Sequence, residues 1–295
     1  MTGPTEAARR VLDAAAGAAG MDATGAVLIR DGSNVLFQLV GGVVARIGRP
    51  GSQETAAREV QVARWLATTN VCAVPALDGV PQPTVVSNRP VTWWELLPPH
   101  RPGTTAELGA VLRALHALPP PDDPMLPVHD PFAGLGVQLG GTTVLDDSDL
   151  AWLLAHLDRL RGQYRTLGST DASRVVHGDA WQGNVAVPRG GRPILLDFEH
   201  VCLGQPDWDL VPIAVDYTDF ARLTAEDYSA FVDAYGGHDV TSTEGFRVLA
   251  EIQELRWVSY VLSKASDGTA ARAETRHRIA CLRGEVPRPW TWAAF

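Results

Sequence analysis

The pattern of hydrophobic and polar positions divides the chain into a β-rich first part and a helical second part. Runs of β-branched residues, which favour strands, are separated in the first part by short turn sequences such as Gly41-Gly42, a two-residue hairpin signal. Apolar positions spaced by three and four residues predict a helix over 53–67. The elements expected here are helices over 5–19 and 53–67 and strands over 26–30, 34–40, 43–47, 84–87 and 91–97.

The second part follows a Pro-rich linker at 98–103 and is helical by its periodicity. Thr104 and Glu107 form a capping-box pattern, and a stripe of leucines behind them predicts a buried helix face. A short β segment interrupts the helices, with strands expected over 174–177, 184–187 and 194–198. The helices that follow this pattern are expected over 104–118, 147–167, 209–220, 225–236, 243–265 and 268–283.

The interrupting β segment carries the most specific motif of the chain. Residues 177–184 read HGDAWQGN, and the apolar run 194–196 ends in Asp197. Phosphoryl transfer from a nucleotide needs a carboxylate that faces the attacking hydroxyl, and oxygen ligands that hold magnesium. We therefore expect Asp179 to be the catalytic base and Asn184 and Asp197 to be the magnesium ligands. Considered separately, Asp179 and Asn184 could each be a turn residue without a catalytic role.

With HGDAWQGN, ILLDFEH and the helix end LRALHAL in place, the chain resembles the aminoglycoside phosphotransferase family over roughly residues 25–285. The resemblance implies an α+β, bilobal protein-kinase-like fold, with a small antiparallel β N-lobe that holds one key helix and a larger, mainly helical C-lobe. On this basis, residues 1–97 are the expected nucleotide-binding lobe and residues 98–295 the expected catalytic and substrate-binding lobe. ATP or GTP is the implied co-substrate, with Mg²⁺ as the metal.

The same resemblance implies a nucleotide site. Arg46 stands on a strand where kinases place a phosphate-contacting lysine, and Glu59 in the following helix is its expected partner. An alternative interpretation is that both residues are exposed surface charges. The loop over the phosphates would contain Ser33 and Asn34, although it lacks GxGxxG. The hinge that contacts the nucleobase would lie at 93–97, with backbone groups of the two residues Glu95 and Leu97.

Charge limits the function classes and suggests an acceptor. The formal net charge of −9 argues against general nucleic-acid binding, which needs a basic face. The segment 197–254 holds thirteen acidic and two basic residues, which fits either a solvated acidic surface or a field that attracts a cationic substrate such as an aminoglycoside, aminosugar or amino alcohol. The acceptor-site candidates in this segment are Trp208, Asp216, Asp219, Glu251 and Glu254. Alternatively, the helix periodicity predicts that the aromatic residues are buried in the hydrophobic core.

Cysteine content and hydropathy predict a cytoplasmic protein. The three cysteines are far apart and form no CxxC pair, which favours reduced thiols over a disulfide scaffold or metal cluster. No stretch approaches eighteen uninterrupted apolar residues, so a membrane span is not expected. The sequence does not predict an oligomeric state.

Two alternatives to a small-molecule kinase stay open. A nucleotide-binding pseudokinase is supported by Arg46 in place of lysine and by the reduced phosphate loop. A protein kinase fits less well, because HRD, DFG and an APE-ended activation segment are missing and only eight residues separate Phe198 from Asp207.

Overall fold

The computed structural model describes residues 4–167, 173–265 and 268–295, and its contacts define two compact units. Unit 1 comprises Met1–Pro127 and Gln182–Val201, and unit 2 comprises Val128–Trp181 and Cys202–Phe295. These units assign the segment after residue 97 partly to the sheet-containing unit. The predicted functional boundary between residues 97 and 98 stays a prediction.

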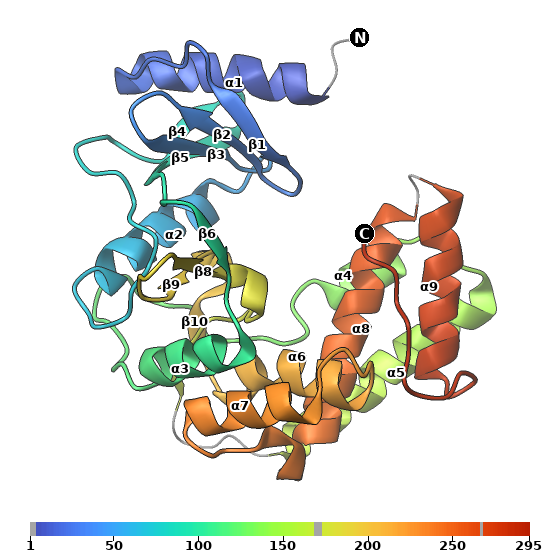
Figure 1. Ribbon diagram of the computed structural model, residues 1–295. Helices are drawn as coiled ribbons and strands as arrows, with labels where there is room; N and C mark the ends of the chain where they lie inside the picture. Colours follow the sequence, from blue (N-terminus) through green and yellow to red (C-terminus); the bar gives the residue numbers. More distant parts are fainter. Residues whose placement is uncertain (1–3, 168–172, 266–267) are drawn as a thin grey trace. The chain divides into compact units, whose positions relative to one another are not determined.

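Unit 1 is built on an antiparallel sheet in the order β1-β2-β3-β5-β4 (Figure 1). Its strands are β1 (Val27–Asp31), β2 (Val35–Leu39), β3 (Val43–Ile47), β4 (Thr84–Val86) and β5 (Arg89–Glu95). Helix α1 (Pro4–Ala19) covers one face, where Leu12 joins Phe37 and Trp93 in a buried cluster. Because side chains alternate along a strand, Val44 and Arg46 point to the opposite face.

The turn between β2 and β3 shows how the sequence sets this sheet. Leu39 pairs with Val43, so three residues form the loop rather than the two predicted. Gly41 and Gly42 have φ values of 89° and 80°, a region that side chains disfavour. Helix α2 (Gln53–Leu66) follows β3 and contacts β5 and the 3₁₀-helix η2 (Phe198–His200).

A second, three-stranded sheet completes unit 1 in the order β6-β8-β9. Its strands are β6 (His100–Pro102), β8 (Val185–Pro188) and β9 (Ile194–Leu195), and the 3₁₀-helix η1 (Gln182–Asn184) leads into β8. Helix α3 (Thr105–His116) follows β6 and begins with the predicted capping box between Thr104 and Glu107. The segment 98–103, expected to be only a linker, therefore contributes a strand.

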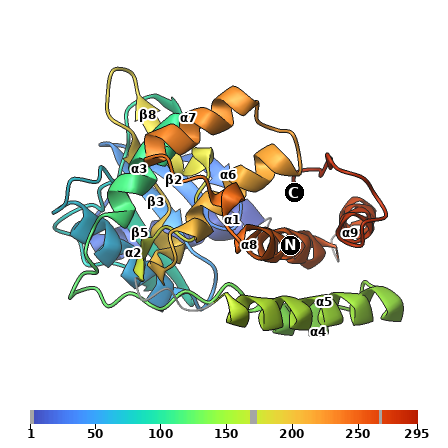
Figure 2. The ribbon, with the colours of Figure 1, turned by 90° about the horizontal axis from the view of Figure 1, so that it is seen from below.

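Unit 2 is mainly helical (Figures 1 and 2). Its helices are α4 (Leu135–Gly140), α5 (Asp147–Thr166), α6 (Asp207–Thr218), α7 (Ala225–Tyr235), α8 (Phe246–Lys264) and α9 (Thr269–Leu282), with the 3₁₀-helix η3 (Val240–Ser242). Strands β7 (Arg174–Val176) and β10 (Cys202–Gly204) form a small antiparallel ladder. Helix α8 is central, because α4, α5, α6 and α9 all contact it.

The predicted α+β class is confirmed, with an antiparallel sheet in the N-terminal region and helices in the C-terminal region. The long helices and the strands of the first sheet agree with the periodicity within a few residues. No sequence pattern predicted α4, β6 and β10, which have between three and six residues. Within the described ranges, no helix has the length and apolar content needed to cross a membrane.

Candidate active site

Strand register brings Asn184 and Asp197 together in unit 1. Val185 pairs with Leu195, and the Leu196 N–H donates to the Asn184 carbonyl at 2.9 Å, so the two predicted metal ligands flank one end of the β8–β9 ladder. Asp197 has a φ of 61°, unusual for a residue with a side chain, and turns the chain from β9 into η2. Its side chain is 41% exposed, whereas Asn184 is buried. The register therefore places an amide residue and a carboxylate residue at the same end of this ladder.

This donor set fits magnesium. Mg²⁺ prefers hard oxygen ligands and takes few of them from the protein, filling the other positions with phosphate oxygens and water. In the part of the chain that the structure describes, no three or more His, Cys, Asp or Glu side chains form a self-contained metal site. Asn184 and Asp197 would hold the ion only together with the nucleotide.

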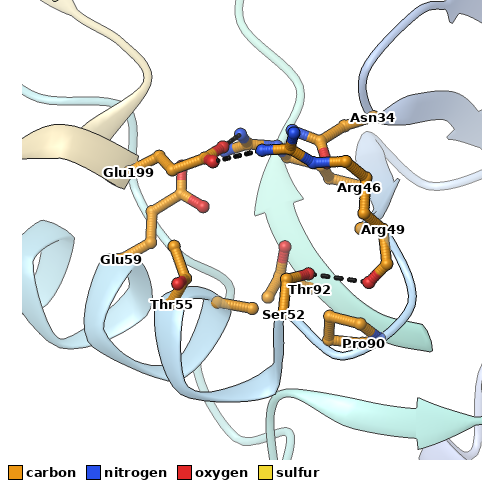
Figure 3. A pocket seen from close by; sticks show the side chains of 11 residues that line it. Asn34, Arg46, Arg49, Ser52, Thr55, Glu59, Pro90, Thr92 and Glu199 are labelled. Atoms are coloured by element: carbon orange, nitrogen blue, oxygen red, sulfur yellow. Dashed lines mark hydrogen bonds and ion pairs between the residues drawn. The ribbon is translucent and has the colours of Figure 1, made fainter. Parts of the chain in front are cut away.

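Arg46 on β3 lies beside Glu59 and Glu199 (Figure 3) and also bonds Asp197 in this turn. Its Nη1 atom donates to Glu59 from α2, its Nη2 atom donates to Asp197 Oδ1 at 3.0 Å, and Nη2 also reaches Glu199 Oε2 at 3.2 Å. The Arg46 and Glu59 side chains are 13% and 4% exposed. The reading of both residues as surface charges is therefore wrong. The predicted Arg46–Glu59 pairing is present.

Burial and charge compete in this cluster. Burial disfavours the charged form of Arg46, but the carboxylates of Glu59, Asp197 and Glu199 outweigh it and raise the pKa of the guanidinium. For Glu59, burial dominates over the attraction of Arg46, and the neighbouring carboxylates add to it, which raises the pKa of Glu59 to about 7. Arg46 thus faces three carboxylates, and Arg49 adds a second cation through Glu199, so the negative charges of the cluster outnumber the positive ones.

The predicted phosphate loop contacts Arg46 through Asn34. When the Asn34 amide is oriented with its oxygen toward Arg46, that oxygen accepts from Nε at 3.0 Å and from Nη2 at 2.6 Å. Ser33, the other predicted loop residue, is exposed. The loop therefore contacts the same guanidinium that is expected to bind phosphate.

A small cavity lies beside this cluster and is lined by Arg46, Arg49, Ser52, Glu59, Thr92 and Glu199 (Figure 3). Its volume is about 20 Å³, which holds little more than one water molecule. It is too small for a nucleotide. No sequence motif marks Arg49, whose Nη2 atom donates to Glu199 Oε1 at 2.9 Å.

The predicted hinge lies at the end of β5. The Glu95 N–H donates to the Pro75 carbonyl at 3.0 Å, so this amide is used within the chain, and the Leu96 N–H donates to Gly42 at 2.8 Å. This pattern is compatible with the Glu95 carbonyl and the Leu97 amide as nucleobase contacts. The sheet face that carries Arg46 also carries Leu36 and Val44, apolar side chains that sequence reasoning did not single out.

Asp179 lies in unit 2, in a loop held by buried groups. The Asp209 carboxylate, fully buried, accepts from the backbone N–H of His177 at 2.6 Å and of Gly178 at 2.8 Å. The Trp208 indole N–H donates to the Gly178 carbonyl at 3.3 Å. Asp209, in the first turn of α6, therefore braces the loop. Trp208, predicted to contact the acceptor, is 3% exposed and supports the loop instead.

Arg256 of α8 provides a cation near Asp179. Its Nη1 atom donates to the Pro131 carbonyl at 3.2 Å, and its guanidinium lies 5.8 Å from the Trp208 ring centroid. Burial lowers the pKa of Arg256, and the charges of Asp179 and Asp130 partly offset this effect. No sequence motif marks Arg256, because it lies in an ordinary helical stretch.

The four predicted acceptor-site carboxylates are all paired with arginine. Asp216 bonds Arg222 at 2.8 Å, and Glu251 bonds Arg159 at 2.6 Å. A separate cluster joins Asp219 and Glu254, which are 2% and 0% exposed, to Arg247 at 2.8 and 2.6 Å and to Arg288 at 3.1 and 3.8 Å. Burial and a hydrogen bond to Asp219 raise the pKa of Glu254 well above its usual value. The structure brings Asp219 and Glu254 together as a buried network.

Unit 2 also contains an open cavity of about 410 Å³, within the range of small-molecule sites. Its wall is mainly apolar, and α8 and the C-terminal segment contribute four aromatic residues to it: Trp257, Tyr260, Trp292 and Phe295. Arg222 and Arg278 also line it. The cavity could accommodate a compact organic molecule with an apolar face.

Comparisons with known proteins agree with this geometry. The model of a family described as "Phosphotransferase enzyme family" matches residues 27–252. A choline/ethanolamine kinase family protein from Mesorhizobium loti is 19% identical, with a TM-score of 0.65 over 97% of this chain and 95% of that one. The amicoumacin kinase hAmiN, in complex with AMP-PNP, Ca²⁺ and Ami, is 15% identical with a TM-score of 0.69 over 90% of each chain.

A third solved structure, the GDP and kanamycin complex of APH(2")-IIia, is 13% identical, with a TM-score of 0.68 over 94% of this chain and 98% of that one. At these identities the likeness concerns the fold. No curated protein matches the chain.

Proposed function

Because the chain belongs to the phosphotransferase enzyme family, we propose that it moves the terminal phosphate of magnesium-bound ATP or GTP to a hydroxyl of a small molecule. The family match confirms the resemblance that the motifs indicated. Together with the solved structures it also confirms the predicted enzyme class, a small-molecule kinase. The protein-kinase-like fold class is confirmed by the solved structures. The residue roles, the metal and the nucleotide are our proposal.

The observation that carries the proposal is the turn at Asp197. Asn184 and Asp197 flank one strand end, and Arg46 bonds Asp197 at 3.0 Å. We propose that Asn184 and Asp197 ligate Mg²⁺, which neutralises the phosphates and the charge that develops on transfer. Arg46, positioned by Glu59, would contact a phosphate oxygen with its guanidinium.

The remaining nucleotide contacts come from unit 1. Ser33 and Asn34 would lie over the phosphates, and the Glu95 carbonyl and Leu97 amide would bond the nucleobase edge. Leu36 and Val44 support a nucleobase position against the sheet, because they add apolar surface to the face that carries Arg46.

Asp179 is the proposed base. Its carboxylate would accept the proton of the acceptor hydroxyl as the oxygen attacks the terminal phosphorus and the nucleoside diphosphate departs. Three observations support this role: Asp179 is exposed, its loop is braced by buried Asp209, and Arg256 contributes positive charge nearby.

The acceptor is proposed to be an amine-bearing alcohol, of the aminoglycoside, aminosugar or amino alcohol class. Two related structures carry ligand or family names of this kind, kanamycin and choline/ethanolamine. The predicted carboxylates lend less support than expected, since Asp216, Asp219, Glu251 and Glu254 all bond arginine.

The three cysteines are free thiols, which supports the proposed cytoplasmic location.

Acceptor-dependent release of ADP or GDP tests the function. The purified protein is incubated with Mg²⁺ and either ATP or GTP, against kanamycin, glucosamine, choline, ethanolamine and neutral myo-inositol. We expect one amine-bearing acceptor to stimulate turnover and Asp179→Asn to lower kcat on it by at least about a hundredfold. The matched control is Asp233→Asn, which changes an exposed aspartate on α7 of the same unit. Unchanged turnover by Asp179→Asn would remove Asp179 as the base.

A nucleotide-binding pseudokinase is the second candidate. Its support is Arg46, which replaces lysine and bonds three carboxylates and Asn34. Magnesium-dependent nucleotide binding without phosphate transfer to any acceptor of the panel would favour it.

A further inference from the structure

Glu199 connects two arginines with its two carboxylate oxygens. Its Oε2 atom accepts from Arg46 Nη2 at 3.2 Å, and its Oε1 atom accepts from Arg49 Nη2 at 2.9 Å. Arg46 comes from β3 and Arg49 from the turn before α2, whereas Glu199 lies in η2, two residues after Asp197 (Figure 3). Glu199 thus ties the turn at Asp197 to strand β3 through Arg46 and to the turn before α2 through Arg49.

The contacts of Arg46 show why this tie matters. The Nη1 edge is held by Glu59, and the Nε edge is held by Asn34. The Nη2 atom is shared among Asp197, Glu199 and Asn34. Asp197 and Asn34 are the two partners expected to contact metal and phosphate, so nucleotide binding competes with their bonds to Arg46. Glu59 and Glu199 have no such competing role in the proposed function.

We propose that Glu199 is a positioning residue that keeps the Arg46 guanidinium in place when Asp197 serves the metal ion. The proposal rests on the function proposed above, in which Asp197 is a metal ligand. Glu59 alone fixes one edge of a planar group at the end of a long side chain. Glu199 fixes the adjacent Nη2 atom, so the two carboxylates together define the plane and direction of the fork.

Glu199 is needed to orient the side chain at position 46 because that residue is an arginine. A lysine ammonium is a compact charge with rotating donors and needs no second partner to orient a plane. The Arg49 contact has its own consequence: it holds Glu199 Oε1, so that Oε2 remains directed at Arg46. Arg49 is 61% exposed while Glu199 is 19% exposed, so the outer arginine covers the inner carboxylate.

The test is nucleotide affinity rather than turnover. Dissociation constants of AMP-PNP and GMP-PNP are measured by calorimetry in Mg²⁺ and in EDTA, and the analogue that binds wild type more tightly is used for all variants. We expect Glu199→Gln to weaken binding about tenfold in Mg²⁺ and less than twofold in EDTA, where Asp197 still holds Arg46. Thermal unfolding monitors the fold of each variant.

A double-mutant cycle separates a role through Arg46 from direct metal binding. In an Arg46→Lys background, Glu199→Gln should change the Mg²⁺-dependent affinity less than twofold. Arg49→Gln in the wild-type background should weaken it two- to threefold, and Arg64→Gln, an exposed arginine on α2, should leave it unchanged.

Each other result overturns the inference. Equal losses in Mg²⁺ and EDTA would indicate a structural role, and no loss would remove any role. A tenfold loss that persists with Arg46→Lys would assign Glu199 to the metal itself. Nucleotide binding by wild type that does not depend on Mg²⁺ would overturn the metal role of Asp197, and with it both proposals. Tight Mg²⁺-dependent binding with an unaffected Glu199→Gln would leave the proposed function standing alone.

Discussion

Asp209→Asn tests whether the loop that carries Asp179 is held by one buried carboxylate. Asp209 is fully buried and accepts two backbone N–H groups, at 2.6 and 2.8 Å. Hydrogen bonds to a charged group contribute about 1.5 to 3 kcal/mol each. Asparagine retains one oxygen for one N–H and turns its NH₂ group toward the other. We therefore expect a loss of about 3 kcal/mol in stability from one broken charged bond and one uncompensated donor.

The same substitution should affect catalysis. His177 and Gly178 immediately precede Asp179, so a shift of their backbone displaces the proposed base, and a displacement of about 1 Å can lower the rate about a hundredfold. The assays are thermal unfolding, with a Tm decrease of roughly 6 °C for a loss of this size in a chain of this length, and kcat on the acceptor identified in the panel. Asp233→Asn is the control.

A normal Tm together with normal kcat would refute the bracing role of Asp209. A lower Tm with unchanged kcat, measured well below the transition, would show that the brace stabilises unit 2 without positioning Asp179.

Two further predictions concern unit 1. Arg46→Met leaves Glu59 buried without its cation and should lower the free energy of unfolding by about 3 kcal/mol in urea denaturation; equal stability would contradict the ion-pair cluster. Bonds from Arg101, at 2.7 Å, and from the Thr104 N–H outweigh burial and lower the pKa of Glu107 to about 2. Because the folded pKa of Glu107 is below the unfolded value, this stabilisation is present above pH 4.5 and is lost as the pH falls toward 2. Glu107→Gln should therefore reduce the dependence of the unfolding free energy on pH, measured by denaturation at a series of pH values. The same pH dependence in the variant and the wild type would refute this prediction.

The sequence predicted the long elements because their signals are local. The helix of α2 follows an apolar stripe, the cap of α3 follows Thr104 and Glu107, and β3 follows a compact β-branched run. Strands β6 and β10 lack such signals, since each has three residues and forms only by pairing with a distant strand. Tertiary pairing, rather than propensity, decides these elements.

The acceptor candidates show the limit of counting charge along the chain. The segment 197–254 is strongly acidic in sequence, but Arg159 and Arg288, which lie outside it, bond Glu251 and the Asp219–Glu254 pair. Local net charge therefore overstates the local field. The missed contact between Arg49 and Glu199 has the same origin, because it joins residues 150 positions apart.

The positions of the candidate metal ligands were easier to predict from the sequence than the acceptor site, because the motif spacing corresponds to a hairpin. A turn between β8 and β9 returns the chain so that Asp197 reaches the end of the ladder at Asn184. Sequence also placed Arg46 and Glu59 as partners, one on a strand and one on the next helix. It gave no sign that Arg46 would also bond Asp197.

The central claim is that Asn184 and Asp197 hold the metal of a bound nucleotide. Its most direct measurement is an electron paramagnetic resonance titration of Mn²⁺ into the wild-type protein, Asn184→Ala and Asp197→Asn, each with saturating AMP-PNP or GMP-PNP. We predict that both substitutions weaken Mn²⁺ binding to the nucleotide complex at least tenfold and change metal-free nucleotide affinity less than threefold. Wild-type Mn²⁺ affinity in both variants would contradict the claim.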